Sequence, residues 1–544
     1  MLLLAYTGGD TMNKNKTQLV PIPKEKGIHI KTAGAKREKY VYKYVKYFRN
    51  EEGKPRNKAK AIGKLADKPG MMIPNGNYFE MFHVEPSLPH LSVWDYGFTF
   101  LVRKVCHSLG LFDILKDTFG ATAEHILAIA AFLLKDGGAL DGMEEWQERA
   151  FLEECDKIIS SQDASRIFSG ITYKQRMQFF RKWIPSAHTD GTVCYDVTSI
   201  SSYARDMPSV ERGYNRDHED LCQYNLGMFC DEKTKMPLYY ERYNGSLTDR
   251  SNLSYVMANA ADMGLRKVKM VLDGGFWSKE CIQYLGKSCH SFTMGMPSSL
   301  KEATKAIDHS RNNIEQYRNK LAGYQVYCTE QAATLHGIEG RILVYYDPFN
   351  HACTVGELCN SIARMETELS HLKRFPKSKL TRYSKYFKFT KHEKGNGFDY
   401  EVDVEKVEAL SKNKGFFLLF TTDKEASASD LLYFYRAKDA DEKLFGQIKN
   451  EMDGKRIRTH SERTTDGKTF VIFLACLLRS YMMGKLQRYL SEQSTSMKKV
   501  WHQLSNIVMV ECNGVRRLAK ALTKKQKDIL ALFGAERELL ASLE

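Results

Sequence analysis

Three acidic residues occupy positions at which carboxylates can do chemistry. Asp196 lies in the middle of the β-branched run GTVCYDVTSI, Asp273 ends the apolar run KVKMVLD, and Glu442 lies in YRAKDADEKLFGQIK. An acid inside a buried strand is costly unless it is paired or binds a cation. Hard cations such as Mg²⁺ take oxygen ligands, and two such ions suit phosphodiester chemistry. The set therefore indicates metal-dependent chemistry, although a capping or hydrogen-bonded role would explain either aspartate alone.

The third acid has aromatic and basic neighbours at helical spacing. Tyr435, Lys438, Glu442 and Lys449 are three, four and seven residues apart, which places them on one face of a helix. The apolar stripe beside this face consists of Ala437, Ala440, Leu444 and Ile448, with Phe445 between the two. We expect a single helix over residues 435–449 that packs on a core and presents the polar row. The alternative is an ordinary solvated face with one Lys–Glu pair.

Composition limits the class of protein. With 544 residues and 43% hydrophobic residues, the chain is long enough for two to four globular domains. Its formal net charge of +15 favours a polyanion partner, nucleic acid before a membrane surface. The apolar run Phe470–Leu478 is far shorter than the ~20 residues of a membrane span. Twelve scattered cysteines without a C-x-x-C pair favour reduced thiols in the cytosol over a zinc site.

Strands and helices alternate around the first two acids. After the strand with Asp196, the pattern predicts strands at 223–230, 238–243, 267–273 and 291–296, and helices at 250–263 (capped by Thr248 or Asp249) and 278–286. This order predicts a mixed α/β sheet. Asp273 would then end a strand just before a glycine turn, where α/β folds place functional groups.

The N-terminal region, residues 1–93, is predicted to be β-rich and basic. Residues 36–64 contain eleven Lys or Arg against three Glu, and aromatic residues alternate with other types from Tyr40 to Val45. A turn follows at 50–53. Two interpretations stay open: a cationic, aromatic-bearing ribbon on DNA, or an ordinary hairpin with a solvated face.

The remaining chain divides into four further segments. Residues 94–188 are predicted to form a helical subdomain, with helices at 94–115, at 125–134 and from the cap Thr172 to Pro185. This subdomain is either a DNA-binding module or a plain helical bundle. Residues 189–300 form the first part of the core, 301–422 an insertion, and 423–544 the Glu442 helix and a helical C-terminal region. The insertion is expected to hold helices at 299–321 and 355–372, strands at 324–328, 341–346 and 415–422, and a basic, aromatic tract at 373–394.

These motifs resemble the DDE transposases of bacterial insertion sequences, in the group whose third acid lies in a Tyr, Arg, Glu, Lys signature. Tyr435, Lys438, Glu442 and Lys449 reproduce its gaps of two, three and six residues, with Lys438 where Arg is more usual. YDVTS and LDGGFWS are similar to the family's first and second acid motifs. PLYYERYNGSLTD resembles the segment between them, and residues 40–63 and ALTKKQKDIL resemble flanking parts.

The resemblance implies an RNase H-like catalytic core with a mainly β insertion. It implies that Asp196, Asp273 and Glu442 hold two Mg²⁺ or Mn²⁺ ions. It implies that Tyr435, Lys438 and Lys449 contact DNA-end phosphates. We expect the basic residues that follow this segment, Lys455, Arg456 and Arg458, to bind DNA as well. The implied reaction is cleavage at the element's ends, followed by attack of the freed 3′-hydroxyls on target DNA, as in cut-and-paste transposition. The implied partners are the terminal inverted repeats and target DNA, bound by a homodimer in the bacterial cytoplasm, on the nucleoid, with no membrane.

Some related enzymes pass through a DNA hairpin and hold a flipped base with a tryptophan. Trp277 lies close to the second acid, but we expect it to pack in the core. Two other functions stay open. One is a non-catalytic DNA-binding protein derived from a transposase, which the presence of all three acids disfavours. The other is a metal-dependent nuclease without strand transfer, which needs the same metal site.

Overall fold

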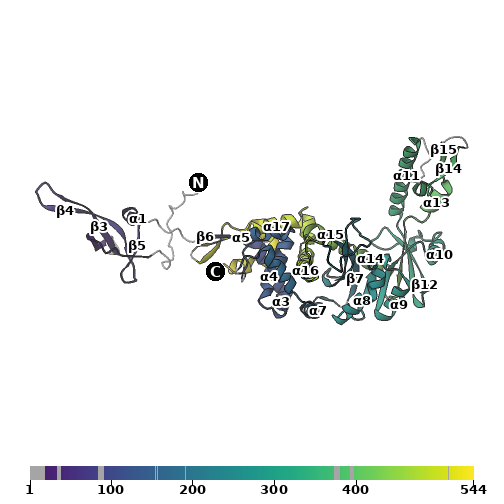
Figure 1. Cartoon of the computed structure of the whole chain (residues 1–544), viewed down its shortest axis with the longest axis horizontal. Coiled ribbons are helices and arrows are strands. Elements are labelled where there is room, and N and C mark those ends of the chain that lie inside the picture. Colours follow the sequence, from purple (N-terminus) through teal and green to yellow (C-terminus); the bar gives the residue numbers. More distant parts are fainter. Residues whose placement is uncertain are drawn as a thin grey trace. The chain divides into compact units, whose positions relative to one another are not determined.

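The computed structural model describes residues 19–33, 38–83, 91–153, 155, 157–189, 191–372, 380–392, 397–512 and 514–543, with the side chains of 439–442 left out. The chain forms two compact units (Figure 1). The first contains Met1–Val93, Met509–Ala519 and Ala541–Glu544; the second contains Trp94–Val508 and Lys520–Leu540.

The first unit is built on an antiparallel sheet, which confirms the prediction of β structure in this region. Its strands follow the order β1-β5-β4-β3-β2. They are β1 (Val20–Pro21), β2 (Ile28–Ala33), β3 (Glu38–Arg49), β4 (Pro55–Leu65) and β5 (Met71–Pro74). Helix α1 (Gly76–Phe82) packs its aromatic residues on Val41, Ile62 and Met72. The predicted turn joins β3 to β4, where the Asn50 side chain accepts a hydrogen bond from the Lys54 amide. A small separate sheet has the order β19-β18-β6, from β6 (Leu91–Asp95), β18 (Val508–Cys512) and β19 (Val515–Leu518).

The second unit begins with a set of helices, as predicted. They are α2 (Gly97–Ser108), α3 (Leu111–Phe119), α4 (Thr122–Lys135), the 3₁₀ turn η1 (Leu140–Gly142), α5 (Met143–Arg149), α6 (Ser161–Gly170) and α7 (Tyr173–Ala187). The helical spacing over 94–115 is divided between two helices, because Gly110 at φ 64° separates α2 from α3. Thr172 does cap α7, in a capping box with Gln175. The end predicted at Pro185 is wrong: the helix runs on to Ala187, since a proline in the last turn removes only one hydrogen bond.

A central mixed sheet follows, with the order β12-β13-β16-β11-β10-β7-β8-β9 and β17 beside β7. Its strands are β7 (Thr192–Ser202), β8 (Gln223–Asp231), β9 (Pro237–Asn244), β10 (Lys269–Leu272), β11 (Ser291–Met296), β12 (Tyr327–Leu335), β13 (Ile338–Tyr346), β16 (Phe416–Thr421) and β17 (Arg456–Ile457). Strands β7, β10 and β11 run parallel to one another, and β8, β9, β13 and β16 pair antiparallel. The mixed α/β class is therefore confirmed, and the strands predicted around both aspartates are present.

Further helices of this unit lie between these strands in the sequence or follow them. They are α8 (Asp249–Asp262), the 3₁₀ turn η2 (Gly274–Phe276), α9 (Lys279–Ser288), α14 (Ala428–Ala437), α15 (Asp439–Glu451), α16 (Glu462–Glu492), α17 (Met497–Ser505), α18 (Lys524–Ala531) and α19 (Glu536–Ala541). Thr248 caps α8, one of the two caps predicted. Helix α16 is long and apolar enough to cross a membrane, but 72% of its apolar window is buried inside the protein. It packs on α4 and α6 and so forms a core helix.

The region between β11 and β16 differs from the expectation of a mainly β insertion. It contains α10 (Lys301–Ser310), η3 (Tyr317–Asn319), β12, β13, α11 (Pro348–Ser370), α12 (Leu380–Tyr383), β14 (Phe387–Lys391), β15 (Phe398–Val402) and α13 (Val404–Ser411). The longest of these elements is the 23-residue helix α11, and β12 and β13 extend the central sheet. The helix predicted for 299–321 is also too long, because the poor helix formers Asn312 and Asn313 follow α10. Of the basic tract, 373–379 and 393–394 lie outside the described residues.

One buried carboxylate fastens the end of β8 to the end of α7. Asp231 is fully buried and lies 3.2 Å from His188 Nδ1. It also accepts hydrogen bonds from the amides and hydroxyls of Thr189 and Thr234, at 2.8–3.0 Å. Burial raises the pKa of Asp231, but these hydrogen bonds outweigh burial and hold the pKa below its ordinary value of 3.8.

We expect Asp231→Asn to lower the free energy of unfolding at pH 7 by about 2 kcal/mol, because it removes charge-assisted hydrogen bonds in a buried site. A lowered folded pKa stabilises the protein above the ordinary pKa of 3.8, and this stabilisation is lost as the pH falls below it. Urea unfolding should therefore separate native protein and variant at pH 7, and the difference should shrink progressively as the pH falls below 3.8. The exposed Asp262 provides a matched control as Asp262→Asn; a difference that does not change with pH would contradict the assignment.

Candidate active site at the ends of β7 and β10

The sheet register brings the two aspartates together. Strands β7 and β10 are parallel neighbours, and Leu272 lies opposite Tyr195. Asp273 follows Leu272 and Asp196 follows Tyr195, so the two acids lie next to each other across the sheet. Asp196 is within β7 and partly buried, whereas Asp273 leaves β10 just before the turn Gly274–Phe276. The register of β7 and β10 therefore places these two acids side by side, a pairing that the sequence did not specify.

Asp273 is held by two groups from α14 and its end. Lys438 Nζ lies 3.0 Å from Asp273 Oδ1, and the Tyr435 hydroxyl donates to the same oxygen at 3.2 Å. Burial raises the pKa of Asp273, but the charge and hydrogen bond of Lys438 outweigh it and keep the pKa below 3.8. The Lys438 side chain is only 7% exposed, so this ammonium is part of the site and not a surface cation.

Asp196 has the opposite electrostatic setting. Burial raises its pKa to about 6, and the negative charge of Asp273 adds to that effect. The positive charge of Lys438 and the Val197 amide act against it but do not cancel it. The two carboxylates lie side by side, and that of Asp196 is poorly solvated. A bound cation would therefore stabilise their ionised forms.

The signature segment is not one helix, which corrects the prediction for 435–449. Helix α14 ends at Ala437 and α15 begins at Asp439, and Lys438 lies between them with helical backbone angles (φ −58°, ψ −26°). The predicted apolar side is present, since Leu444, Phe445 and Ile448 are buried. The backbone of Glu442 lies in the first turn of α15, but its side chain lies outside the described residues.

A glycine that sequence reasoning missed makes the contact with Asp273 possible. Gly295 in β11 faces the site: a Cβ added there would lie 2.5 Å from the Tyr435 hydroxyl and 2.9 Å from the Gly274 amide nitrogen. Any side chain at this position would therefore push Tyr435 or the turn after Asp273 away. The sequence SFTMGM offered only a glycine inside a strand, a pattern that marks close approach of other groups.

The other predicted DNA-binding residues group around the loop between β7 and β8 (residues 203–222). Lys449 Nζ lies 2.7 Å from Asp217 and its side chain is 10% exposed. Arg456 and Lys455 lie 2.9 and 3.5 Å from Glu219. The Arg456 hydrogen bond lowers the pKa of Glu219 to about 2. Lys449 thus fastens this loop to α15.

Arg458 is the most exposed of these cations. Its side chain is 64% exposed, and its Nε lies 3.7 Å from Asp453. Asp217 and Glu219 were not predicted from sequence. Their only signal was the acid-rich motif NRDHED after the first strand.

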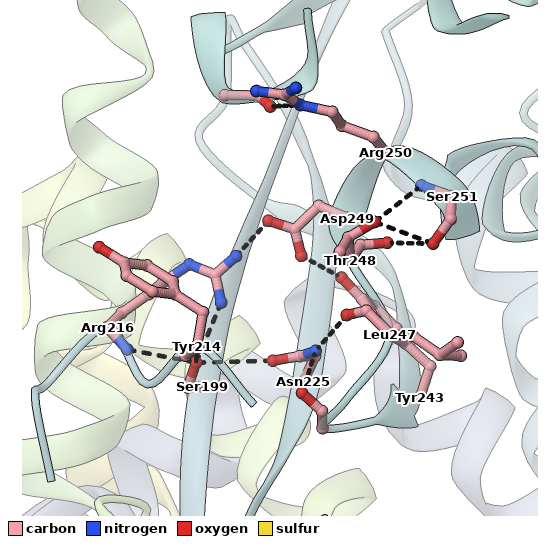
Figure 2. Close-up of polar contacts among 12 residues, drawn as sticks. Ser199, Tyr214, Arg216, Asn225, Tyr243, Leu247, Thr248, Asp249, Arg250 and Ser251 are labelled. Carbon is pink, nitrogen blue, oxygen red and sulfur yellow. Dashed lines mark hydrogen bonds and ion pairs between the residues drawn. The ribbon is translucent and has the colours of Figure 1, made fainter. Parts of the chain in front are cut away.

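Arg216 belongs to the same loop and contacts residues of β7 and α8 (Figure 2). It donates to Ser199 Oγ at 3.0 Å and pairs with Asp249, which also accepts from the Tyr243 hydroxyl at 2.7 Å. Its charge acts on Asp196 and lowers the pKa of that carboxyl. Arg250, at the start of α8, donates from Nε to the Gly275 carbonyl at 2.7 Å. Sequence reasoning found neither arginine; together they fix the surroundings of both aspartates.

Trp277 packs as expected. It is 8% exposed, and its ring meets Phe420 edge-on at 6.2 Å between centroids. This tryptophan follows the turn after Asp273 but serves the hydrophobic core.

The arrangement fits a divalent cation. Among the side chains that the structure describes, no three His, Cys, Asp or Glu residues form a cluster around one point, so Asp196 and Asp273 stand as a pair. Glu442 is four residues beyond Lys438, one helical turn along. The ammonium of Lys438 already places positive charge against this pair. Mg²⁺ and Mn²⁺ bind to negatively charged oxygen ligands, and the carboxylates of Asp196 and Asp273 supply them.

Comparisons with known proteins identify a transposase domain in this part of the chain. The protein-family model described as "Transposase DDE domain" matches residues 187–478 of the 544, a span that includes Asp196, Asp273 and Glu442. Among solved structures, a similar chain comes from the "Cryo-EM structure of piggyBac transposase synaptic complex with hairpin DNA", with 12% identity and a TM-score of 0.32. That match covers 68% of this chain and 60% of the other, less than two thirds of its length. No curated protein matches the sequence.

Proposed function

The chain belongs to the DDE transposase family, and from this premise we propose that it cuts DNA at the ends of a mobile element and joins the freed 3′-hydroxyls to target DNA. The observation that carries the proposal is the pair Asp196 and Asp273 on neighbouring parallel strands, with Lys438 against the second acid. Such a site suits a reaction in which negative charge develops on phosphate oxygens.

We propose that the core is RNase H-like. Support comes from the strand order β9-β8-β7-β10-β11, in which β7, β8 and β9 are antiparallel and β7, β10 and β11 are parallel. In this arrangement the first strand lies in the centre and carries Asp196, and the fourth strand adds Asp273 beside it. The helix α15, which carries Glu442, packs on β7.

Asp196, Asp273 and Glu442 would hold two Mg²⁺ or Mn²⁺ ions, which supply an activated attacking hydroxyl and stabilise the leaving oxygen. The chain's own groups then have separable tasks. Asp273 is kept ionised by Lys438 and Tyr435. We also assign to these two residues a contact with the phosphate of a DNA end bound next to the carboxylates. Lys449 holds the loop at Asp217, so we assign it a positioning role.

The cations on the strand after α15 would extend the DNA contact away from the cut site. Lys455, Arg456 and Arg458 flank or belong to β17, which pairs with the end of β7. Double-stranded DNA, as terminal repeats and as target, is the proposed partner, bound by a homodimer on paired ends. The proposed place of action is the nucleoid in a bacterial cytoplasm.

The proposed function is tested by incubating the protein with a DNA fragment that carries the element's own end and a supercoiled target plasmid. We expect Mg²⁺-dependent cleavage at the end and covalent joining of the 3′ strand to the plasmid, with both products lost in Glu442→Gln while DNA binding is kept. Cleavage without joined product would identify a nuclease. Tight binding to the end without any cleavage would identify a non-catalytic DNA-binding protein.

Lys438 also gives a prediction about metal affinity. Lys438→Met removes a buried positive charge from Asp273, so we expect the DNA-free protein to bind Mn²⁺ about tenfold more tightly, equivalent to about 1.4 kcal/mol. Electron paramagnetic resonance of free Mn²⁺ during titration measures this affinity. The exposed Lys424 supplies the control Lys424→Met, and equal Mn²⁺ affinity in native protein and Lys438→Met would show that the ammonium does not oppose the metal.

A further inference from the structure

The hairpin of β3 and β4 extends past every strand that flanks it. Strand β2 pairs with β3 only from Glu38 to Lys43, and β5 pairs with β4 only from Gly63 to Leu65. The outer part, residues 44–49 of β3 with residues 55–59 of β4, forms a two-stranded ribbon that we call the ribbon arm (Figure 1). The Tyr44 amide donates to the Gly27 carbonyl at 3.0 Å, and beyond Tyr44 no described strand pairs with either edge of the arm. A long open edge of this kind is unusual unless a partner or charge protects it.

One face of the ribbon arm carries positive charge at directly opposed positions. Lys46 lies opposite Lys58, and Arg56 lies opposite Phe48, all on the same face. Like charges directly across a strand pair destabilise a sheet. In the described part of the chain no carboxylate pairs with Lys46, Lys58 or Arg56, although Lys43 and Lys64 nearer the core are paired with Glu25 and Glu38. The outer face is therefore arranged for a negatively charged partner that lies outside this unit.

The opposite face carries aromatic rings. His29 stacks on Tyr42 and Tyr44, with ring centroids 5.7 and 4.5 Å apart, and Tyr44 contacts Tyr47 at 5.4 Å. Tyr47 is nevertheless 69% exposed, and Phe48 on the basic face is 46% exposed. This row of rings stiffens the arm and ends in an exposed tyrosine. A ribbon that served only to cover its own core would bury these rings.

We propose that the ribbon arm binds duplex DNA in the major groove, with Lys46, Lys58 and Arg56 against the phosphates. The major groove admits a two-stranded ribbon, and phosphates supply the negative charge that the opposed lysines require. This inference rests on the proposed function only in the choice of DNA as the polyanion. It adds a binding surface in the first unit, distinct from the acids and cations of the second.

The test measures DNA affinity of the full chain by fluorescence anisotropy, with a labelled 30-base-pair duplex at several salt concentrations. For Lys46→Gln/Lys58→Gln we expect weaker binding and a plot of log Kd against log[salt] whose slope is smaller by about 2, since each phosphate contact contributes about 1. The control is Lys301→Gln/Lys305→Gln, which removes two exposed lysines from α10. An unchanged slope in the arm variant, or an equal change in the control, would overturn the proposal.

A charge reversal separates binding from folding. Lys58→Glu places a carboxylate opposite Lys46, so we expect Tm to be maintained or raised while DNA affinity falls further than in the glutamine variant. Loss of both Tm and affinity would overturn the assignment in favour of a structural role.

Equal affinity for duplex RNA would also overturn it, because the major groove of A-form RNA is too narrow to admit a ribbon. If the lysine substitutions in the arm reduce the slope of log Kd against log[salt] but the native protein cuts no DNA, the DNA-binding role of the arm is supported and the proposed function is rejected.

Discussion

Replacing Asp196 with asparagine is expected to slow metal-dependent DNA cleavage by about a thousandfold. The change removes one charged oxygen ligand from the pair on β7 and β10, and metal stabilisation of a transition state is worth several kcal/mol. At 1.36 kcal/mol for each factor of ten, a loss of about 4 kcal/mol gives this rate. Single-turnover cleavage of a DNA end at saturating protein measures it, and Mn²⁺ titration should show weaker binding in the same variant.

The same substitution should leave the fold intact. Burial and the charge of Asp273 raise the pKa of Asp196 to about 6, so the ionised carboxylate is unfavourable in the metal-free protein. Asparagine removes that charge without changing the shape of the side chain, and Tm should stay level or rise. Asp262→Asn, at an exposed position on α8, serves as the matched control. A rate within tenfold of native protein, with Mn²⁺ affinity unchanged, would remove Asp196 from the metal site.

Replacing Asp466 with asparagine is expected to give the largest loss of stability, about 3–5 kcal/mol in the free energy of unfolding. Asp466 on α16 joins two arginines that are each 10% exposed: Arg176 on α7 at 2.8 Å and Arg242 on β9 at 2.7 Å. Removing one partner from a buried ion pair leaves uncompensated charge, which accounts for this cost. Glu462 also pairs with Arg242, so the variant still neutralises one of the two arginines.

Denaturant unfolding measures this loss as a lower midpoint at an unchanged slope. Asp262→Asn again serves as the control, because it removes an exposed carboxylate without a buried partner. A midpoint equal to that of the control would mean that the two arginines find other partners or water, and that α7, β9 and α16 are held by apolar packing alone.

Local patterns in the sequence were sufficient to predict the two strands that carry Asp196 and Asp273. The apolar runs around Asp196 and before Asp273 each specify a buried strand, and a glycine turn after Asp273 places the carboxylate at a strand end. The parallel pairing of β7 with β10 follows from the helix α8 between them, since parallel neighbours need a crossover connection. These features depend on short windows of sequence and on the general rules of α/β folds.

Contacts between residues far apart in the sequence could not be predicted from local patterns. Helical spacing placed Tyr435 and Lys438 on one face, but nothing local shows that both donate to Asp273, or that Gly295 leaves the necessary room. The break at Lys438 was also missed, because every residue from 435 to 449 is compatible with a helix. The expectation of a mainly β insertion came from the family and not from the residues, and α11 contradicts it.

The contact between Tyr435 and Asp273 joins residues 162 positions apart, with the whole region from α10 to β16 between them. During synthesis on a ribosome, the first 300 residues contain both aspartates but none of the groups from α14 and α15. At about 5–20 residues per second, these 162 positions take roughly 8 to 32 seconds to synthesise. A chain truncated before Lys438 therefore carries both aspartates on their strands but lacks Lys438 and Glu442. Under the proposed function, DNA cleavage begins only after these residues have been synthesised.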